Sequence, residues 1–172
     1  MTKQELLVVL KKKLEVLKKQ LEYYLGTQIN DEEVARNKLY NLAKSKIGQD
    51  LSKIASNNLG CAEAVSRILN ELLGKTVDIT TSTYWLYQSL NNCLFKRVNK
   101  PEPGCIIISP TGYGDGRIPH GHVGIVSNNS LIMSNNSNNG KWEENFSIDG
   151  WYRYYKVGGG YPVLFYKLKR LF

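Results

Sequence analysis

Two residue types that support nucleophilic catalysis, cysteine and histidine, are both rare in this sequence. The chain has three cysteines, Cys61, Cys93 and Cys105, and two histidines, His120 and His122. An odd number of cysteines argues against a full disulfide framework, and no CxxC pair is present for a structural zinc site. At least one thiol is therefore expected to be free, and in a small enzyme a free thiol can act as a nucleophile.

Cys61 is the best placed of the three cysteines for that role. It stands at the expected start of a helix, where unpaired backbone N–H groups and the positive end of the helix dipole lower the pKa of a thiol. Cys105 falls inside an expected strand, and Cys93 follows two asparagines in an expected loop, so neither has such an activator. Position therefore favours Cys61 as the nucleophile, and the alternative is a buried, inert cysteine.

The two histidines lie close together in the segment PHGHVGIV. His122 begins an alternating apolar strand, a position that holds a side chain rigidly, as a general base requires. His120 lies in the preceding loop, so His122 and Cys61 together predict a Cys–His dyad. A metal site is the alternative, because the two histidines are spaced i, i+2 and would share one face of a strand. Cys105 or Asp115 could then join them as ligands.

The chain around these residues changes from helical to strand periodicity. Leucines at every third or fourth position predict a helix over residues 7–24, ended by Gly26, and two further helices are expected over residues 30–47 and 61–72. Short apolar runs bounded by Gly, Asn and Pro then predict four strands, at residues 105–109, 122–126, 130–134 and 162–166. Helices followed by strands predict an α+β fold in which helices pack on an antiparallel sheet.

The first expected helix carries an apolar seam with the spacing of a coiled coil. The seam consists of Leu7, Leu10, Leu14, Leu17, Leu21 and Tyr24. It covers fewer than three heptads and is marginal for an independent coiled coil. Packing on the helix's own domain, self-association and attachment to a larger assembly are the alternatives, and binding to a membrane surface is the weakest of them. We expect residues 1–27 to form this helix and residues 28–172 to form the catalytic domain.

Length and composition limit the class of protein. The 172 residues correspond to one domain with a short appendage, and no apolar stretch approaches the length of a membrane-spanning helix. A net charge of +8 favours an anionic partner, such as nucleic acid, a membrane surface or a cell-wall polymer. Nucleic acid has no further support, because no interleaved basic and aromatic motif is present. No secretory signal is recognised at the N-terminus.

The order of the motifs resembles the NlpC-type cysteine peptidases, papain-like enzymes that cut peptide bonds in bacterial peptidoglycan and are related to the CHAP amidases. The matching segments are GCAEAV, PEPGCIIIS, GHVGIV and SLIMSNNS, within about residues 35–170. The resemblance implies that Cys61 is the nucleophile and His122 the general base. Cys105 stands where the family usually has Asp, as a structural substitution. The segment 132–155 further resembles cell-wall hydrolases encoded by phages, the endolysins.

The family orients its histidine with a polar residue about twelve positions later, on the next strand. That count reaches Ser134, whereas the side-chain carbonyl of the adjacent Asn135 is the better acceptor for a ring N–H, so Asn135 is favoured slightly. The resemblance implies a peptidoglycan endopeptidase or amidase with a Cys–His–polar triad and no metal or organic cofactor. It also implies release at the bacterial cell wall by a phage route, or attachment to a virion. The alternative from another class is a non-catalytic module on the same fold that binds cell wall or protein.

Overall fold

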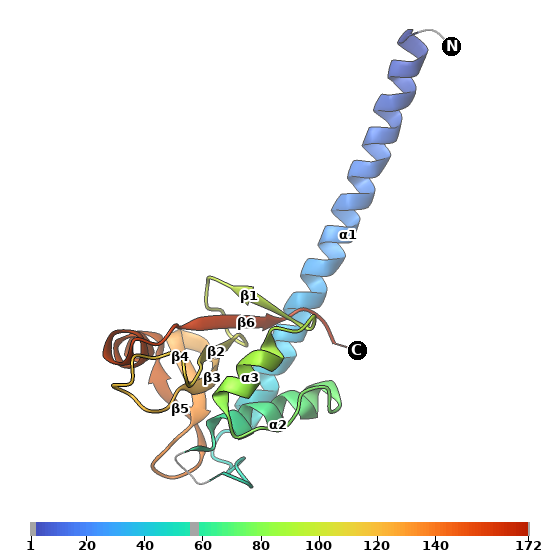
Figure 1. The fold of residues 1–172 in the computed structure, drawn as a ribbon. Coiled ribbons are helices and arrows are strands. Elements are labelled where there is room, and N and C mark those ends of the chain that lie inside the picture. The colour runs from blue at the N-terminus through green and yellow to red at the C-terminus, as the bar shows by residue number, and fades with distance from the viewer. Residues whose placement is uncertain (1–2, 56–58, 172) are drawn as a thin grey trace.

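Helices come first along the chain and strands dominate its second half (Figure 1). The computed structural model describes the backbone of residues 3–55 and 59–171, and the side chains in that range except those of residues 3–5, 8, 9 and 27–30. The helices are α1 (Lys3–Ser45), α2 (Cys61–Leu73), α3 (Thr83–Leu90), η2 (Asn128–Ser130), α4 (Ile148–Trp151) and η3 (Tyr152–Gly158). The strands are β1 (Phe95–Val98), β2 (Ile106–Ser109), β3 (His122–Val126), β4 (Leu131–Asn135), β5 (Trp142–Ser147) and β6 (Leu164–Leu168).

The six strands form one antiparallel sheet in the order β1-β6-β2-β3-β4-β5. The predicted α+β class with an antiparallel sheet is confirmed. In the central strands, His122 lies opposite Ser109 of β2, and Gly124 lies opposite Ser134 of β4. Because side chains alternate between the two faces of a strand, this register places His122 and Ser134 on the same face of the sheet.

Each face of the sheet is covered by a hydrophobic core. One core joins α1, α2 and α3 to side chains of the sheet that include Ile106, Ile108 and Val123. The other joins α4 and η3, through Trp151 and Tyr155, to side chains of the sheet that include Ile107, Val126 and Phe165. His122 neighbours Val123 and therefore points towards the second core, among its aromatic rings.

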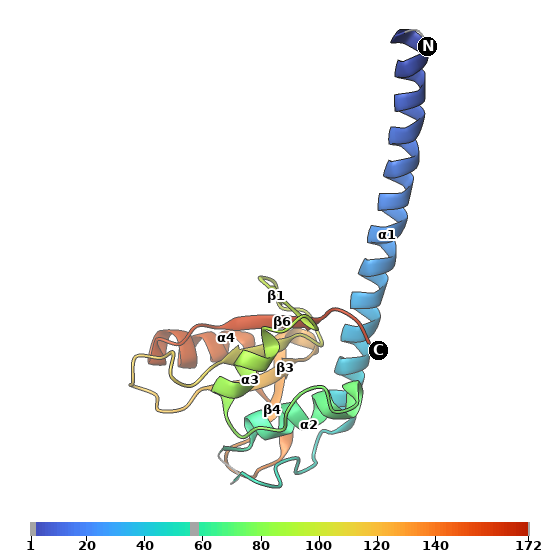
Figure 2. The same cartoon turned by 45° about the vertical axis from the view of Figure 1, so that its right-hand side comes forward.

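Helix α1 is continuous over 43 residues, so the expected break between Gly26 and residue 30 is absent. Its C-terminal part packs on the domain through Ala35, Leu39 and Ala43, and the indole of Trp142 donates a hydrogen bond of 2.9 Å to the carbonyl of Ala43. Its N-terminal part projects from the domain in both views (Figures 1 and 2). Packing of the seam on its own domain was one of the expected alternatives, and the structure does not show it.

The exposure of the seam is nearly uniform. Its five leucines are each 52 to 61% exposed. Within the described residues, no helix is both long enough and apolar enough to cross a membrane.

Candidate active site

Cys61 is the first residue of α2, and the loop in front of the helix packs closely beside it. Glycine at position 60 allows this approach, because a Cβ there would lie 2.5 Å from the Cβ of Ser52 and 3.0 Å from Nδ2 of Asn135. The Cys61 thiol is free, and the residue is 7% exposed. The nucleophile candidate is thus held at a helix start between a loop and the sheet.

The surroundings of Cys61 act on its thiol in two opposite directions. Burial raises the pKa of the thiol to about 11. The backbone N–H groups of Val123, Ala62 and Cys61 itself act against burial, because their hydrogen bonds favour the thiolate. At neutral pH the thiol is therefore protonated, and three backbone donors surround the sulfur when the proton leaves.

His122 is the first residue of β3 and is 6% exposed. Its ring lies among three aromatic rings, with centroid distances of 5.1 Å to Trp151, 5.7 Å to Phe146 and 5.8 Å to Tyr155. Burial lowers the pKa of His122 to about 4. The imidazole is consequently uncharged at neutral pH, which is the state in which it can accept a proton.

One contact relates the Cys61 thiol to the strand that carries His122. The N–H group of Val123, the residue after His122, hydrogen-bonds to the sulfur of Cys61. Tyr155 stacks on His122 with an interplanar angle of 14°. Burial, and to a smaller extent the electrostatic effect of a Cys61 thiolate, raise the pKa of Tyr155. The structure thus connects the predicted nucleophile to the backbone of the residue next to the predicted base.

A hydrogen-bonded chain leads away from the other side of the imidazole. Nε2 of His122 lies 3.0 Å from Oγ of Ser134, and Oγ of Ser134 donates to Oδ1 of Asn145 over 2.5 Å. Because the Ser134 proton points to Asn145, Oγ of Ser134 accepts from an Nε2–H group of His122. This tautomer leaves Nδ1 of His122 with a free lone pair, so Nδ1 is the basic nitrogen.

The contact with His122 belongs to Ser134, although Asn135 was slightly favoured for it. The two residues are adjacent on β4, so their side chains point to opposite faces of the sheet. The side chain of Asn135 lies beside Gly60, at the start of α2. The count along the sequence therefore located the partner of His122 better than the chemistry of the amide group did.

The loop before Cys61 is anchored by Glu63, a residue that sequence reasoning missed. Its buried carboxylate accepts backbone hydrogen bonds of 2.7 to 3.0 Å from Lys53, Ile54 and Ala55, and Nη2 of Arg67 pairs with it at 2.7 Å. Burial pushes the pKa of Glu63 upwards, but these donors outweigh burial and hold the pKa below its usual value. Glu63 is thus a fixed anion that shapes the backbone beside the thiol.

The other cysteine and histidine residues do not join this group. His120 is exposed in the loop between β2 and β3, Cys93 is exposed, and Cys105 is buried in the second core. The alternative metal site of His120, His122 and Cys105 or Asp115 is not formed. Among the residues that the structure describes, no three His, Cys, Asp or Glu side chains are placed to hold a metal ion.

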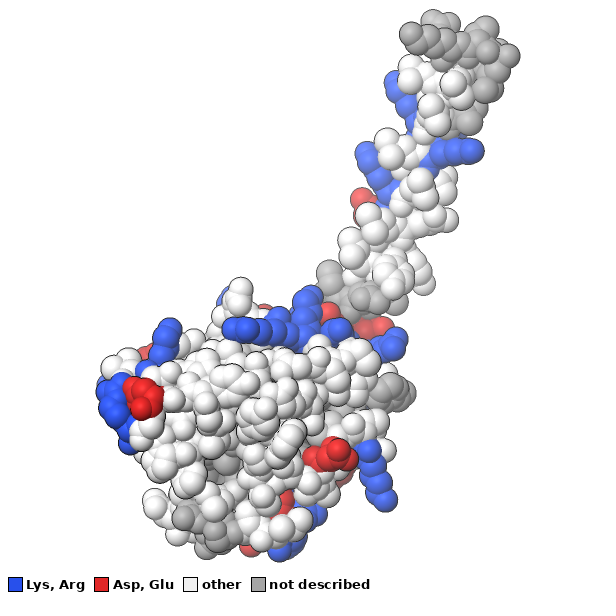
Figure 3. Space-filling view, in the orientation of Figure 1, with Lys and Arg blue, Asp and Glu red and all other residues white. Residues whose placement is uncertain are grey.

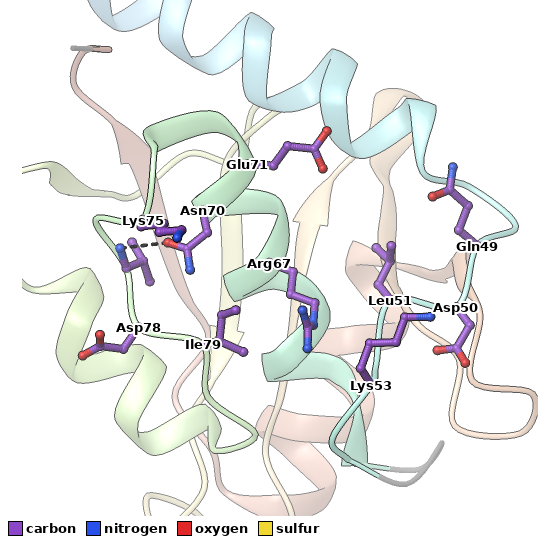
Figure 4. Close-up of a pocket in the computed structure, with 11 residues that line it drawn as sticks. Gln49, Asp50, Leu51, Lys53, Arg67, Asn70, Glu71, Lys75, Asp78 and Ile79 are labelled. Atoms are coloured by element: carbon purple, nitrogen blue, oxygen red, sulfur yellow. Dashed lines mark hydrogen bonds between the residues drawn. The ribbon is translucent and has the colours of Figure 1, made fainter.

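One hollow on the surface lies away from the thiol, along the outer side of α2. It is a groove of about 730 Å3 between α2, the loop before it and the segment after it (Figure 4). Arg67, Asn70 and Glu71 line it from α2, facing Lys53 and Asp78 on the two segments. Cys61, His122 and Ser134 are not among its lining residues, so this groove is separate from the candidate site.

No protein-family model matches the chain, and no curated protein sequence matches it. The solved structures to which the chain is similar include two whose likeness is as follows. One is the type VI native effector–immunity complex Tae3–Tai3 from Ralstonia pickettii, with a TM-score of 0.49 and 23% identity over 76% of this chain and 95% of that chain. The other is Ly7917 with the hydrolyzing product of MDP, with a TM-score of 0.46 and 16% identity over 78% of this chain and 62% of that chain.

Proposed function

We propose that this protein is a cysteine hydrolase of bacterial peptidoglycan, an endopeptidase or amidase of the papain-like, NlpC type. One observation carries the proposal. The Cys61 thiol at the start of α2 accepts a hydrogen bond from the backbone N–H of Val123, and the residue before Val123 is the uncharged His122, whose Nε2 is held by Ser134. A thiol, a base with its lone pair free and a group that fixes the base are the parts that thiol-based acyl transfer requires.

Acylation begins with proton transfer from the thiol of Cys61 to Nδ1 of His122. The sulfur attacks the carbonyl carbon of a substrate amide, and the negative charge moves to the carbonyl oxygen. The backbone N–H group of Cys61, at the start of a helix, would stabilise that oxygen. The His122 imidazolium then gives its proton to the departing amine, the C–N bond breaks, and a thioester on Cys61 remains.

Deacylation uses the same residues with water as the nucleophile. His122 removes a proton from the water, the resulting hydroxide attacks the thioester, and the C–S bond breaks. The proton returns from His122 to the Cys61 sulfur, so one amide and one water yield one carboxylic acid and one amine. This cycle is complete without a metal or an organic cofactor.

A patch of exposed aromatic rings next to the site supports a substrate that contains sugars. Trp85 is 63% exposed on α3 and contacts Tyr84, which stacks on Tyr113. The start of α3 is tied to the site, because Oγ1 of Thr83 lies 2.9 Å from Oγ1 of Thr111, which accepts a hydrogen bond from the N–H of the residue before His122. Flat exposed rings suit the apolar faces of glycan units, and the net charge of +8 suits an anionic wall.

Ser134→Ala should lower the hydrolysis rate on the order of 10²-fold, because a misaligned imidazole loses most of its benefit as a base. Asn135→Ala serves as the control, since its side chain is on the opposite face of β4, and the folded protein should stay closer to wild-type activity. Initial rates with purified peptidoglycan, together with circular dichroism for the fold, measure both. A larger loss for Asn135→Ala would give the orienting role to Asn135 instead.

Mass spectrometry of digested peptidoglycan tests the proposed reaction. Incubation with the full-length protein should produce fragments that each carry one added water, a new amine and a new carboxyl group. Fragments with new reducing ends but no new amines would show glycosidic cleavage and contradict the proposal. The non-catalytic module is the second candidate, because both Cys61 and His122 are nearly covered. Wall binding without any fragments would favour it.

The proposed substrate also sets the place of action. The protein would work at the bacterial cell wall, reached by a phage release route or on a virion. Cell fractionation during phage infection, followed by detection of the protein in virions and in lysates, distinguishes the two routes.

A further inference from the structure

The projecting part of α1 presents an apolar stripe that the domain does not use. This part, residues 3–31, is followed by the first contacts with the sheet, where Glu32 forms ion pairs with Lys96 and Lys167. Arg36 then pairs with Glu102 at 3.1 Å. These ion pairs and the buried residues after them fix the helix to the domain at one end. The stripe itself consists of the seam leucines, each more than half exposed.

The charges beside the seam determine what can pair with it. If the leucines take positions a and d of a heptad, positions e and g flank them and face the partner helix. The charged residues at these flanking positions are Lys11, Lys13 and Lys18, and the others are the uncharged Leu6, Gln20 and Leu25. Basic side chains gather along this part of α1 in Figure 3. Any partner helix therefore meets only positive charges at the edges of the seam.

This pattern opposes pairing between two copies of the chain. In a parallel pair, Lys13 of one copy would face Lys18 of the other, and in an antiparallel pair lysines would again face lysines. Like charges at these positions are destabilising, and a seam of fewer than three heptads provides little apolar burial to offset them. A membrane surface fits less well, because Glu15 and Glu22 lie on the polar face and anionic lipids would repel them.

We propose that the projecting part of α1 binds an acidic amphipathic helix of another protein as a heterotypic coiled coil, and that its lysines prevent pairing with a second copy of this chain. Glutamates at e and g of such a partner would pair with Lys11, Lys13 and Lys18 while its apolar residues cover the seam. Because α1 is already a continuous helix fixed at one end, part of the ordering cost of binding is absent. In this proposal the seam serves to bind another protein and not to join two copies of this chain.

A charge-reversed variant of the protein can stand in for the acidic helix. The variant Lys13→Glu with Lys18→Glu alters the flanking positions, and the matched control Lys12→Glu with Lys19→Glu makes the same charge change at position f, away from the seam. At low ionic strength, light scattering should give the monomer mass of 19.5 kDa for wild type and for each variant alone. An equimolar mixture of wild type and K13E/K18E should give twice that mass, and added salt should reverse the association.

Four outcomes would overturn the proposal. A dimer of the wild-type protein alone would show that the lysines do not prevent self-pairing. A mixture of wild type with K13E/K18E that stays monomeric, or a K12E/K19E mixture that dimerises equally, would show that charge at e and g does not select the partner. Sedimentation of wild type with phosphatidylglycerol vesicles, lost in K13E/K18E while both mixtures stay monomeric, would assign the seam to a membrane surface.

Discussion

Replacement of Cys61 by alanine is expected to abolish hydrolysis of peptidoglycan, with a loss on the order of 10⁴-fold or more. The substitution removes the sulfur that would form the thioester, and no other thiol can take its place. Cys105 is buried in the second core and Cys93 is exposed elsewhere. Release of new amines from purified peptidoglycan measures the loss, and a thermal melt shows whether the variant is folded.

Cys93→Ser is the matched control, because its thiol is exposed and lies outside the site. It should retain wild-type hydrolysis. Cys105→Ser should also retain activity but lose stability, because it places a hydroxyl in a fully buried position. Wild-type hydrolysis by folded Cys61→Ala would overturn the assignment of the nucleophile.

His122→Ala is expected to be as damaging as Cys61→Ala, and the double variant should be little worse than either single variant. In the proposed mechanism the two residues act in one proton transfer, so once either is absent the other has nothing to contribute. Values of kcat/KM for the two single variants and the double variant form the measurement. Since alanine leaves a void among Trp151, Phe146 and Tyr155, His122→Gln provides a second variant that fills more of the space.

His120→Ala is the control for this prediction. His120 is an exposed loop residue two positions before His122, and its loss should have a mild effect. A fatal His120→Ala together with a tolerated His122→Ala would move the base to the loop. Strictly additive losses for Cys61→Ala and His122→Ala would separate the two residues into independent roles.

The strands that sequence patterns predicted are the central ones, and the strands that they missed lie at the two edges of the sheet. β2, β3, β4 and β6 are rich in buried apolar residues, whereas β1 and β5 are mixed in polarity and partly exposed. An edge strand has one neighbour and tolerates charged side chains, as at Lys96 and Arg97 of β1. Alternation of polarity is therefore weak where the sheet ends.

The predicted boundary between the first two helices rested on local residue types, and the structure has no helix end at those residues. Gly26 and Asn30 resemble a stop followed by a new start, yet α1 runs through both. A glycine inside a helix costs about 1 kcal/mol relative to alanine, which a long helix can absorb. The helix α3 was not predicted, because its aromatic residues favour strands. Ser82 nevertheless caps this helix by accepting a hydrogen bond from the N–H of Trp85.

The residues of the candidate site that belong to local sequence motifs were predictable. Cys61 and His122 each stand at the start of an element that the periodicity already marked. Asn145 was not predictable, because its role depends on β5 and on a register between strands that local patterns do not encode. Glu63 was hidden for a similar reason, since its partners are backbone amides of a loop.

The continuous helix α1 also fixes how far the thiol lies from a point at which the helix is attached. Residues 3–31 extend roughly 40 Å as an α-helix, so a copy held by a partner anywhere along this rod keeps its thiol near a fixed distance from the point of attachment. A flexible linker of the same number of residues would let the thiol sample all shorter distances as well. An attached copy would cut the bonds within a thin shell of wall and then stop, until its anchor released it.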